Sequence, residues 1–233
     1  MMNWLQKLFS NPSDQLTLDL TPILGFQPKN ASLYHQALCH SSVDVSKYGD
    51  NERLEFLGDS ILSTVITEHL YHNLPEKNEG TLTDIRSKLV RRKTLNDLAK
   101  KLEIDVLVKT NLGIKTPPSI FGNALEALIA AIYLDKGAAT CKAFIIDKMI
   151  SPNFSLHELE KEISSYKKHF LHWAQKKNKD CRFEVLGETG ESHKKNFKIA
   201  LYLAGENVAT AQGSSKKKAE EAASKIACES LDV

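Results

Sequence analysis

Three acidic residues, Glu52, Glu55 and Asp59, lie at positions i, i+3 and i+7 of one segment. In a helix this spacing places the three carboxylates within one narrow stripe. Carboxylates this close repel one another unless a cation lies among them, and hard divalent cations prefer such oxygen ligands. The alternative is a solvated helix face on which Arg53 pairs with the acids. The stripe therefore indicates either a metal site or a charged surface.

The residues around the stripe favour the metal site. Phe56 shares the carboxylate face, and the flanking residues are apolar: Leu54, Leu57, Ile61 and Leu62. Gly58 interrupts the predicted helix, where Ala would be more stable by about 1 kcal/mol. A glycine at such a position usually marks close packing or the close approach of a ligand.

A fourth acid, Glu126, lies in the apolar segment 122–129. Hydrolysis of a phosphodiester needs a nucleophilic water at neutral pH and stabilisation of charge on the entering and leaving oxygens. Divalent cations held by carboxylates supply both. Taken alone, Glu126 fits equally well as the solvated end of a buried helix.

Helices are predicted to position these acids from about residue 20 to residue 158. Apolar residues recur at helical spacing in four segments: 33–38, 54–70, 85–102 and 124–134. Turn-forming residues separate them: Gly49-Asp50, Leu74-Pro75, Asn78 to Gly80, Gly113, Pro117-Pro118 and Gly137. Ser151 to Asn153 predicts a helix stop, and the charged run 157–162 predicts a short linker. We therefore expect a domain boundary near 160, with an N-terminal extension to about residue 19.

The hydrophobic pattern changes after this boundary. One helical stripe is followed by three runs of alternating apolar residues, which predict strands around 183–185, 197–203 and 208–211. A last helix with small apolar residues closes the chain. Lys216, Lys217 and Lys218 open that helix, where backbone amides and the macrodipole favour an anion. A lysine triplet is also common as solvated surface.

Composition supports two domains with different partners. The chain has 233 residues, of which 42% are hydrophobic and 26% charged, as in ordinary globular proteins. Residues 161–233 carry 14 Lys and Arg against 10 Asp and Glu, whereas the first 160 carry 17 against 19. A basic C-terminal part suits a polyanion, and an acidic remainder suits a metal-dependent site. A second basic stretch, Arg86, Lys88, Arg91, Arg92 and Lys93, predicts either phosphate contacts or a solvated face.

Other classes of protein are disfavoured by the sequence. No apolar run reaches the roughly 18 residues of a membrane helix, and the start is too short and polar for a signal peptide. We therefore expect a cytoplasmic protein. The four cysteines lack metal-binding spacing and are predicted to be reduced structural thiols: Cys39, Cys141, Cys181 and Cys228.

Two acidic motifs resemble those of the ribonuclease III family, the metal-dependent endonucleases that cut double-stranded RNA. Residues 51–60, NERLEFLGDS, are similar to the signature motif of the family, and residues 122–129, GNALEALI, to its second acidic motif. Nearly all of 163–231 resembles the double-stranded RNA-binding domain. The resemblance implies a multidomain protein: an all-α endonuclease domain over 1–160, then an α+β domain of order α-β-β-β-α over 161–233.

The resemblance also assigns the acids to one catalytic cluster. Glu55, Asp59 and Glu126 match the metal-binding acids of the family, with Asp59 and Glu126 as the catalytic pair. Asn123 stands where the family usually has Asp. An amide oxygen can still ligate Mg²⁺, but the cluster loses one negative charge, so we expect a lower metal affinity.

Further positions carry roles by the same resemblance. Glu52 and Glu79 match glutamates of the cleavage groove, where Glu79 meets its counterpart across a dimer. Phe56 matches an aromatic residue inserted into the partner subunit, with a core aromatic as the alternative. His193 matches a loop residue that reaches the RNA minor groove and its 2′-hydroxyls. The lysine triplet 216–218 matches a phosphate clamp.

The implied function is Mg²⁺-dependent cleavage of double-stranded RNA, with Mn²⁺ as an alternative ion. The expected products carry 5′-phosphate and 3′-hydroxyl ends, and the expected substrates are ribosomal RNA precursors and messenger RNA. Cutting two strands needs two acidic clusters, and because the chain has one copy of each motif we expect a homodimer. Neither an organic cofactor nor a membrane is expected as a partner. If Asn123 disables the site, the alternative is an inactive RNA-binding protein that keeps the fold.

Overall fold

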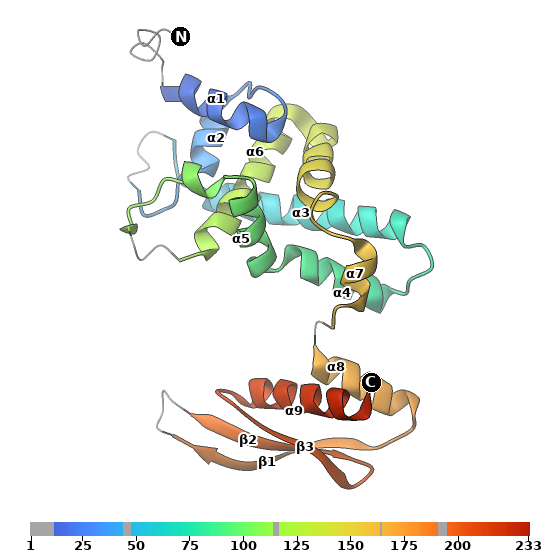
Figure 1. The fold of residues 1–233 in the computed structure, drawn as a ribbon. Coiled ribbons are helices and arrows are strands. Elements are labelled where there is room, and N and C mark those ends of the chain that lie inside the picture. The colour runs from blue at the N-terminus through green and yellow to red at the C-terminus, as the bar shows by residue number, and fades with distance from the viewer. Residues whose placement is uncertain (1–11, 44–47, 114–116, 164, 191–194) are drawn as a thin grey trace, which may run out of the picture. The chain divides into compact units, whose positions relative to one another are not determined.

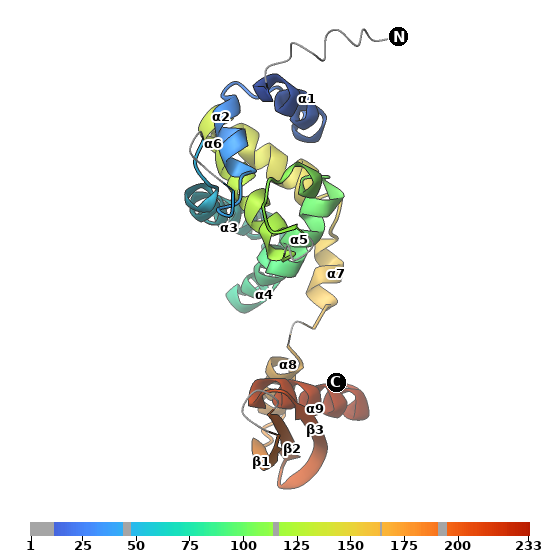
Figure 2. The same ribbon diagram turned by 90° about the vertical axis from the view of Figure 1, so that its left-hand side faces the viewer.

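The computed structural model describes residues 12–43, 48–113, 117–163, 165–190 and 195–233. The chain divides into two compact units, Met1–Glu160 and Lys161–Val233. Figures 1 and 2 show that the first unit is built from helices and that the second combines helices with a sheet. Each unit has a hydrophobic core of its own.

The helices of the first unit pack around α6. Their bounds are α1 (Pro12–Leu24), α2 (Ala31–Ala37), α3 (Glu52–Asn73), α4 (Glu79–Val90), α5 (Arg92–Lys101), η2 (Asp105–Leu107), α6 (Ser119–Ala143), η4 (Phe144–Ile150) and α7 (Leu156–Lys161). Helices α2, α3 and α5 all contact α6, which lies in the middle of the unit (Figure 1). Every apolar residue from Ala124 to Ile132 is buried. Glu126 is the one acidic residue within this buried run from Ala124 to Ile132.

The predicted helical region is confirmed, although it begins earlier than expected. Helix α1 starts at Pro12, before the predicted start near residue 20, and Leu16 packs against the core that contains Leu20 and Leu24. None of the helices within the described ranges is both long and apolar enough to span a membrane. The four cysteines are free thiols, as predicted.

The second unit has the predicted α-β-β-β-α order. Its elements are α8 (Tyr166–Lys176), β1 (Cys181–Thr189), β2 (Asn196–Leu203), β3 (Glu206–Gly213) and α9 (Lys216–Leu231). The strands are antiparallel in the order β1-β2-β3, and both helices cover one face of the sheet (Figure 1). The small residues Ala219, Ala223 and Ala227 are fully buried, so α9 lies close to the strands.

The prediction of a linker over 157–162 is wrong for most of that run. Residues Leu156–Lys161 form α7, and the buried Leu159 packs against the first core. Lys88 is 2% exposed and donates a hydrogen bond of 2.7 Å from Nζ to the carbonyl oxygen of Leu159. Its ammonium also lies 2.8 Å from Asp84. Lys88 is therefore a structural residue that fastens α7 to α4, and neither predicted role of the basic stretch applies to it.

Candidate active site

The first two turns of α3 carry the acidic stripe. Helix α3 begins directly after Asn51, and the backbone N–H of Glu52 donates to Asp50 Oδ1 at 3.1 Å. Glu52 and Glu55 lie in the first turn, where negative charge complements the helix macrodipole. Glu55 is half-buried, and Glu52 and Asp59 are exposed. Within the described residues Arg53 forms no ion pair with these acids. The alternative prediction, a solvated helix face on which Arg53 pairs with the acids, is therefore wrong.

Helices α3 and α6 meet at Gly58. A Cβ atom built on Gly58 would lie 1.8 Å from the carbonyl oxygen of Glu126 and 2.5 Å from its carbonyl carbon. No residue with a side chain fits there unless the helices separate. This contact confirms the expected close packing. It also explains how an acid 67 positions from Asp59 joins the stripe, since Glu126 lies against the residue next to Asp59.

The electrostatics of Glu126 show that the acids form one cluster. Burial, followed by the charges of the neighbouring Asp59 and Glu55, raises the pKa of Glu126 to about 7, against the lowering effect of Arg92. Burial likewise raises the pKa of Glu55, while hydrogen bonding with Asn123 lowers it. Burial and the nearby negative charges both favour the protonated form of Glu126, so this residue is partly buried beside the other acids. Glu126 is therefore not the solvated end of a buried helix.

A hollow of about 210 Å³ opens beside this cluster. Its lining is Glu55, Val90, Arg92, Leu95, Gly122, Asn123 and Glu126. Asp59 does not line it but is close enough to affect Glu126. The hollow thus combines two carboxylates and one amide from two helices, with a third carboxylate beside them.

The oxygen atoms around this hollow fit a hard divalent cation. Glu55, Asn123, Glu126 and Asp59 offer carboxylate and amide oxygens, which are the ligands that Mg²⁺ and Mn²⁺ take. Among the described residues, no three His, Cys, Asp or Glu side chains already stand at ligand positions around one point. Side-chain rotation, or water as an additional ligand, would complete the shell, because Mg²⁺ usually keeps several waters.

Two further predicted positions lie outside this hollow. Glu52 is exposed at the start of α3 and does not line it. Glu79 is the first residue of α4, is exposed, and accepts a hydrogen bond of 2.9 Å from the Thr83 hydroxyl. Their placement in a groove shared by two subunits stays a prediction, as does the role of His193, which lies outside the described residues.

Arg92 has a place in this site that its sequence pattern did not predict. It belongs to the basic stretch for which phosphate contacts or a solvated face are predicted; it is exposed, and it also lines the acidic hollow. Arg91, its neighbour, instead donates from Nε to the Thr94 hydroxyl at 3.2 Å. The spacing of basic residues along the chain carries no signal that separates these two arginines.

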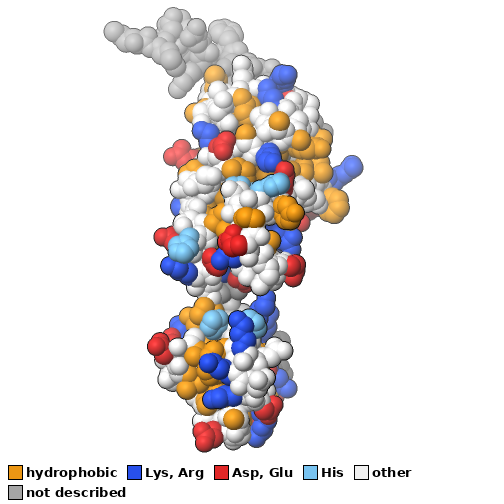
Figure 3. Space-filling view, turned by 90° about the vertical axis from the view of Figure 1, so that its right-hand side faces the viewer, with side chains coloured by type: hydrophobic (Ala, Val, Ile, Leu, Met, Phe, Trp, Pro, Cys, Tyr) orange, Lys and Arg blue, Asp and Glu red, His pale blue; other side chains and the backbone are white. Residues whose placement is uncertain are grey.

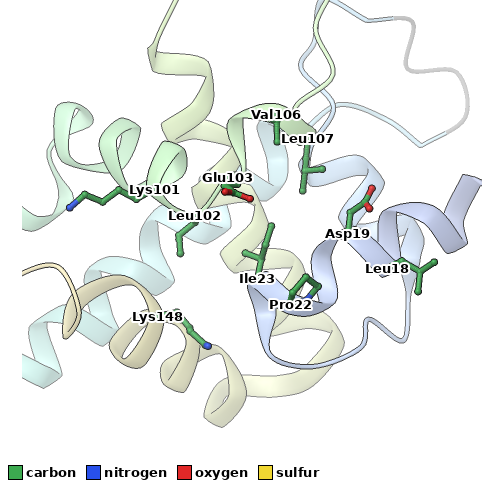
Figure 4. Close-up of a pocket in the computed structure, with 10 residues that line it drawn as sticks. All are labelled: Leu18, Asp19, Pro22, Ile23, Lys101, Leu102, Glu103, Val106, Leu107 and Lys148. Carbon is green, nitrogen blue, oxygen red and sulfur yellow. The ribbon is translucent and has the colours of Figure 1, made fainter. Parts of the chain in front are cut away.

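A larger hollow of the first unit lies elsewhere. It measures about 650 Å³ and is lined by residues of α1, of segment 101–107 and of η4, among them Asp19, Glu103 and Lys148. Figure 4 shows apolar side chains from α1 and η2 on its walls. No residue predicted to act on RNA or metal lines it. Size alone therefore does not identify the candidate active site.

The aromatic side chain of Phe56 is 79% exposed. The alternative prediction, a core aromatic, is wrong for a single copy of the chain. Tyr71, further along α3, is 67% exposed. The ring of Phe56 is therefore accessible to a binding partner.

The start of α9 presents the predicted cationic site. Lys216, Lys217 and Lys218 are all exposed, and the Ser215 side chain caps the helix by accepting the Lys218 N–H at 3.2 Å. Within the described part of the chain none of the three lysines pairs with an acid. In the view of Figure 3, Lys and Arg side chains lie in the middle of the second unit and also at its margins, where the Asp and Glu side chains are found.

Comparison with known proteins matches both units. Residues 30–153 match the ribonuclease-III-like family, and residues 166–231 match the double-stranded RNA binding motif. Ribonuclease 3 of Zunongwangia profunda is 43% identical over 213 residues, covering 89% of this chain and 88% of that protein. Ribonuclease 3 of Flavobacterium psychrophilum is 36% identical over 233 residues, covering 96% and 95%. One similar solved structure is the nuclease domain of ribonuclease III from Campylobacter jejuni, which is described as flexible in a region involved in dimer formation. The match covers 58% of this chain and 96% of that chain, with 36% sequence identity and a TM-score of 0.54.

Proposed function

This chain belongs to the ribonuclease III family, and we propose that it cleaves double-stranded RNA at the hollow between α3, α5 and α6. The family and the double-stranded RNA binding motif together make it a double-strand-specific endoribonuclease. One observation carries the placement of the reaction. Glu126 lies against Gly58 in the middle of the acidic stripe and has its pKa raised to about 7.

The acids would act in this site by holding Mg²⁺, with Mn²⁺ as an alternative. Glu55, Asp59 and Glu126 contribute carboxylates, and Asn123 contributes its amide oxygen. When bound, the ion supplies a nucleophilic water at neutral pH and stabilises charge on the phosphate oxygens. Asp59 and Glu126 are the proposed catalytic pair, and the proposed products carry 5′-phosphate and 3′-hydroxyl ends. Ribosomal RNA precursors and messenger RNA in the cytoplasm are the proposed substrates.

We further propose that two copies of the chain form the working enzyme. One copy holds one acidic cluster, whereas cutting both strands needs two, and a two-fold axis supplies the second. The exposed Phe56 supports this arrangement, because insertion into a partner would remove its ring from water. Glu52 and Glu79 would then line the cleavage groove.

The lysine triplet is expected to bind RNA phosphate. Replacing Lys216, Lys217 and Lys218 with Ala should weaken duplex binding and flatten its salt dependence, by about one unit of log-log slope for each phosphate that the protein no longer neutralises. Cleavage at low salt should partly survive. Fluorescence anisotropy with a labelled duplex, measured across a salt series, gives the slope.

A matched control removes three lysine charges at the carboxyl end of a helix instead of its amino end. Lys176, Lys177 and Lys179 are exposed at the carboxyl end of α8, where the macrodipole disfavours an anion. Their replacement with Ala should change the slope less. Equal slopes for wild type and the 216–218 variant would mean that the triplet is solvated surface.

Asn123→Asp tests whether the natural site is active. The added carboxylate increases attraction for a hard cation, so the half-saturating Mg²⁺ concentration should fall several-fold while kcat changes less. Cleavage of a labelled duplex across a Mg²⁺ titration, with a chelator control, measures both. If wild type is inert with Mg²⁺ and Mn²⁺ while the variant cleaves, the natural chain is an RNA-binding protein that keeps the fold.

A further inference from the structure

Arg92 is the first residue of α5, and a close contact between α5 and α6 fixes the position of its backbone. Asn96 Oδ1 accepts the backbone N–H of Gly122 at 3.0 Å. A Cβ atom on Gly122 would lie 2.7 Å from that oxygen and 3.3 Å from Leu95 Cβ. The two helices therefore touch at Asn96 and Gly122, with no space for a side chain at position 122.

The same contact brings Arg92 to the acids. Arg92 precedes Asn96 by four residues and Glu126 follows Gly122 by four, so each lies one helical turn from the contact. Both side chains line the hollow, together with Glu55 and Asn123. The guanidinium is close enough to lower the pKa values of Glu55 and Glu126, in opposition to their burial.

The charges around the hollow give this arginine a function. Glu55, Asp59 and Glu126 carry three negative charges when ionised, and Asn123 carries none. Arg92 is the one cationic side chain among the residues described as lining the hollow. Because a guanidinium stays protonated at any pH at which proteins are studied, its charge does not depend on solution conditions. With all three acids ionised, the remaining charge of about −2 equals what one divalent cation neutralises.

We propose that Arg92 is a positioning residue that acts as the resting counter-cation of the acidic hollow and competes with a divalent cation for Glu55 and Glu126. This inference rests on the proposed metal-dependent function. Arg92 and Asn123 would then have the same effect on the charge of the site. Arg92 makes the site one charge less negative than Gln would at position 92, and Asn123 makes it one charge less negative than Asp would at position 123. Together the two residues set the concentration of divalent cation at which the hollow binds the ion.

Calorimetric titration of Mn²⁺ into the full-length protein, without RNA, tests the competition. Arg92→Gln should bind Mn²⁺ about tenfold more tightly than wild type, which is the order expected for removing one nearby charge from a partly exposed site. Arg92→Lys keeps the charge and should stay near wild type. Lys93→Gln is the matched control, because Lys93 is exposed, adjacent and outside the hollow. Its Mn²⁺ affinity should not change.

Thermal unfolding supplies a second readout that is independent of RNA. In chelator, Arg92→Gln should melt at a lower temperature than Lys93→Gln, because the carboxylates lose their counter-cation. Addition of Mn²⁺ should raise its melting temperature by more than that of Lys93→Gln. Equal or weaker Mn²⁺ binding by Arg92→Gln, relative to Lys93→Gln, overturns the inference.

Cleavage by wild type, measured alongside, separates the two possible failures. If wild type cleaves duplex RNA with Mn²⁺ but Arg92→Gln binds the ion no more tightly, the counter-cation inference fails and the proposed function stands. If wild type neither binds Mn²⁺ nor cleaves, the proposed function itself fails, and the inference about Arg92 fails with it.

Discussion

Glu126→Gln is expected to reduce the cleavage rate of duplex RNA by at least about a thousandfold while leaving duplex binding nearly unchanged. The carboxylate would hold the metal ion in the hollow, and its amide replacement brings no negative charge. RNA affinity comes mainly from phosphate contacts, which include the lysines at the start of α9. Single-turnover cleavage at saturating Mg²⁺ and anisotropy without divalent cations measure the two quantities separately. A variant that cleaves at near wild-type rate would remove Glu126 from the catalytic pair.

The stability of the same variant is its folding control. Burial first, and then Asp59 and Glu55, raise the pKa of Glu126 from its ordinary 4.5 to about 7. Between these values the folded state holds a proton that the unfolded state has released, so this group lowers the free energy of unfolding as pH rises through that window. Gln cannot ionise. In chelator, the variant should therefore be more stable than wild type at pH 8, by on the order of 2 kcal/mol, and not at pH 4.

Urea unfolding in chelator at the two pH values checks this sign. A variant that is less stable than wild type at pH 8 would show that the drop in cleavage reflects a damaged fold. A variant that is more stable and inactive would assign the drop to the missing carboxylate.

Gly58→Ala is expected to destabilise the first unit by about 3 kcal/mol and to abolish most of the cleavage. The added methyl group would lie 1.8 Å from the Glu126 carbonyl oxygen, which is a backbone atom in a buried helix and cannot move alone. Helices α3 and α6 must separate, and overpacking of this kind costs about 1 to 3 kcal/mol or more. Separation would also move Glu126 away from Glu55 and Asp59. The urea midpoint, followed by helical circular dichroism, measures the destabilisation.

Gly80→Ala provides the matched substitution for this experiment. Gly80 also lies in a helix, α4, and its nearest neighbour to an added Cβ is Asn78 Oδ1 at 3.4 Å. There Ala should be neutral or stabilising by up to about 1 kcal/mol, since it has the higher helix propensity. If Gly58→Ala unfolds at the same urea concentration as Gly80→Ala, the two helices do not pack as the structure has them.

Much of the fold was predictable from sequence because its signals are local. Helical spacing of apolar residues predicted the helices around α6, and alternation predicted the three strands of the second unit. The linker predicted over 157–162 was wrong because that run contains a single apolar residue, Leu159. One apolar residue defines no period, and the α7 helix is held by tertiary contacts with Leu159 and by the hydrogen bond from Lys88.

The sequence by itself determined that Glu52, Glu55 and Asp59 share one face of α3 and that three lysines open α9. A helix fixes the angle between its own residues, so spacing is enough for such statements. Only the tertiary structure decided that Glu126 reaches the acidic stripe at Gly58, that Arg92 lines the same hollow as Glu55 and Glu126, and that Phe56 is exposed. Where two helices cross depends on how all side chains of the core fill space together, and that information lies in no single segment.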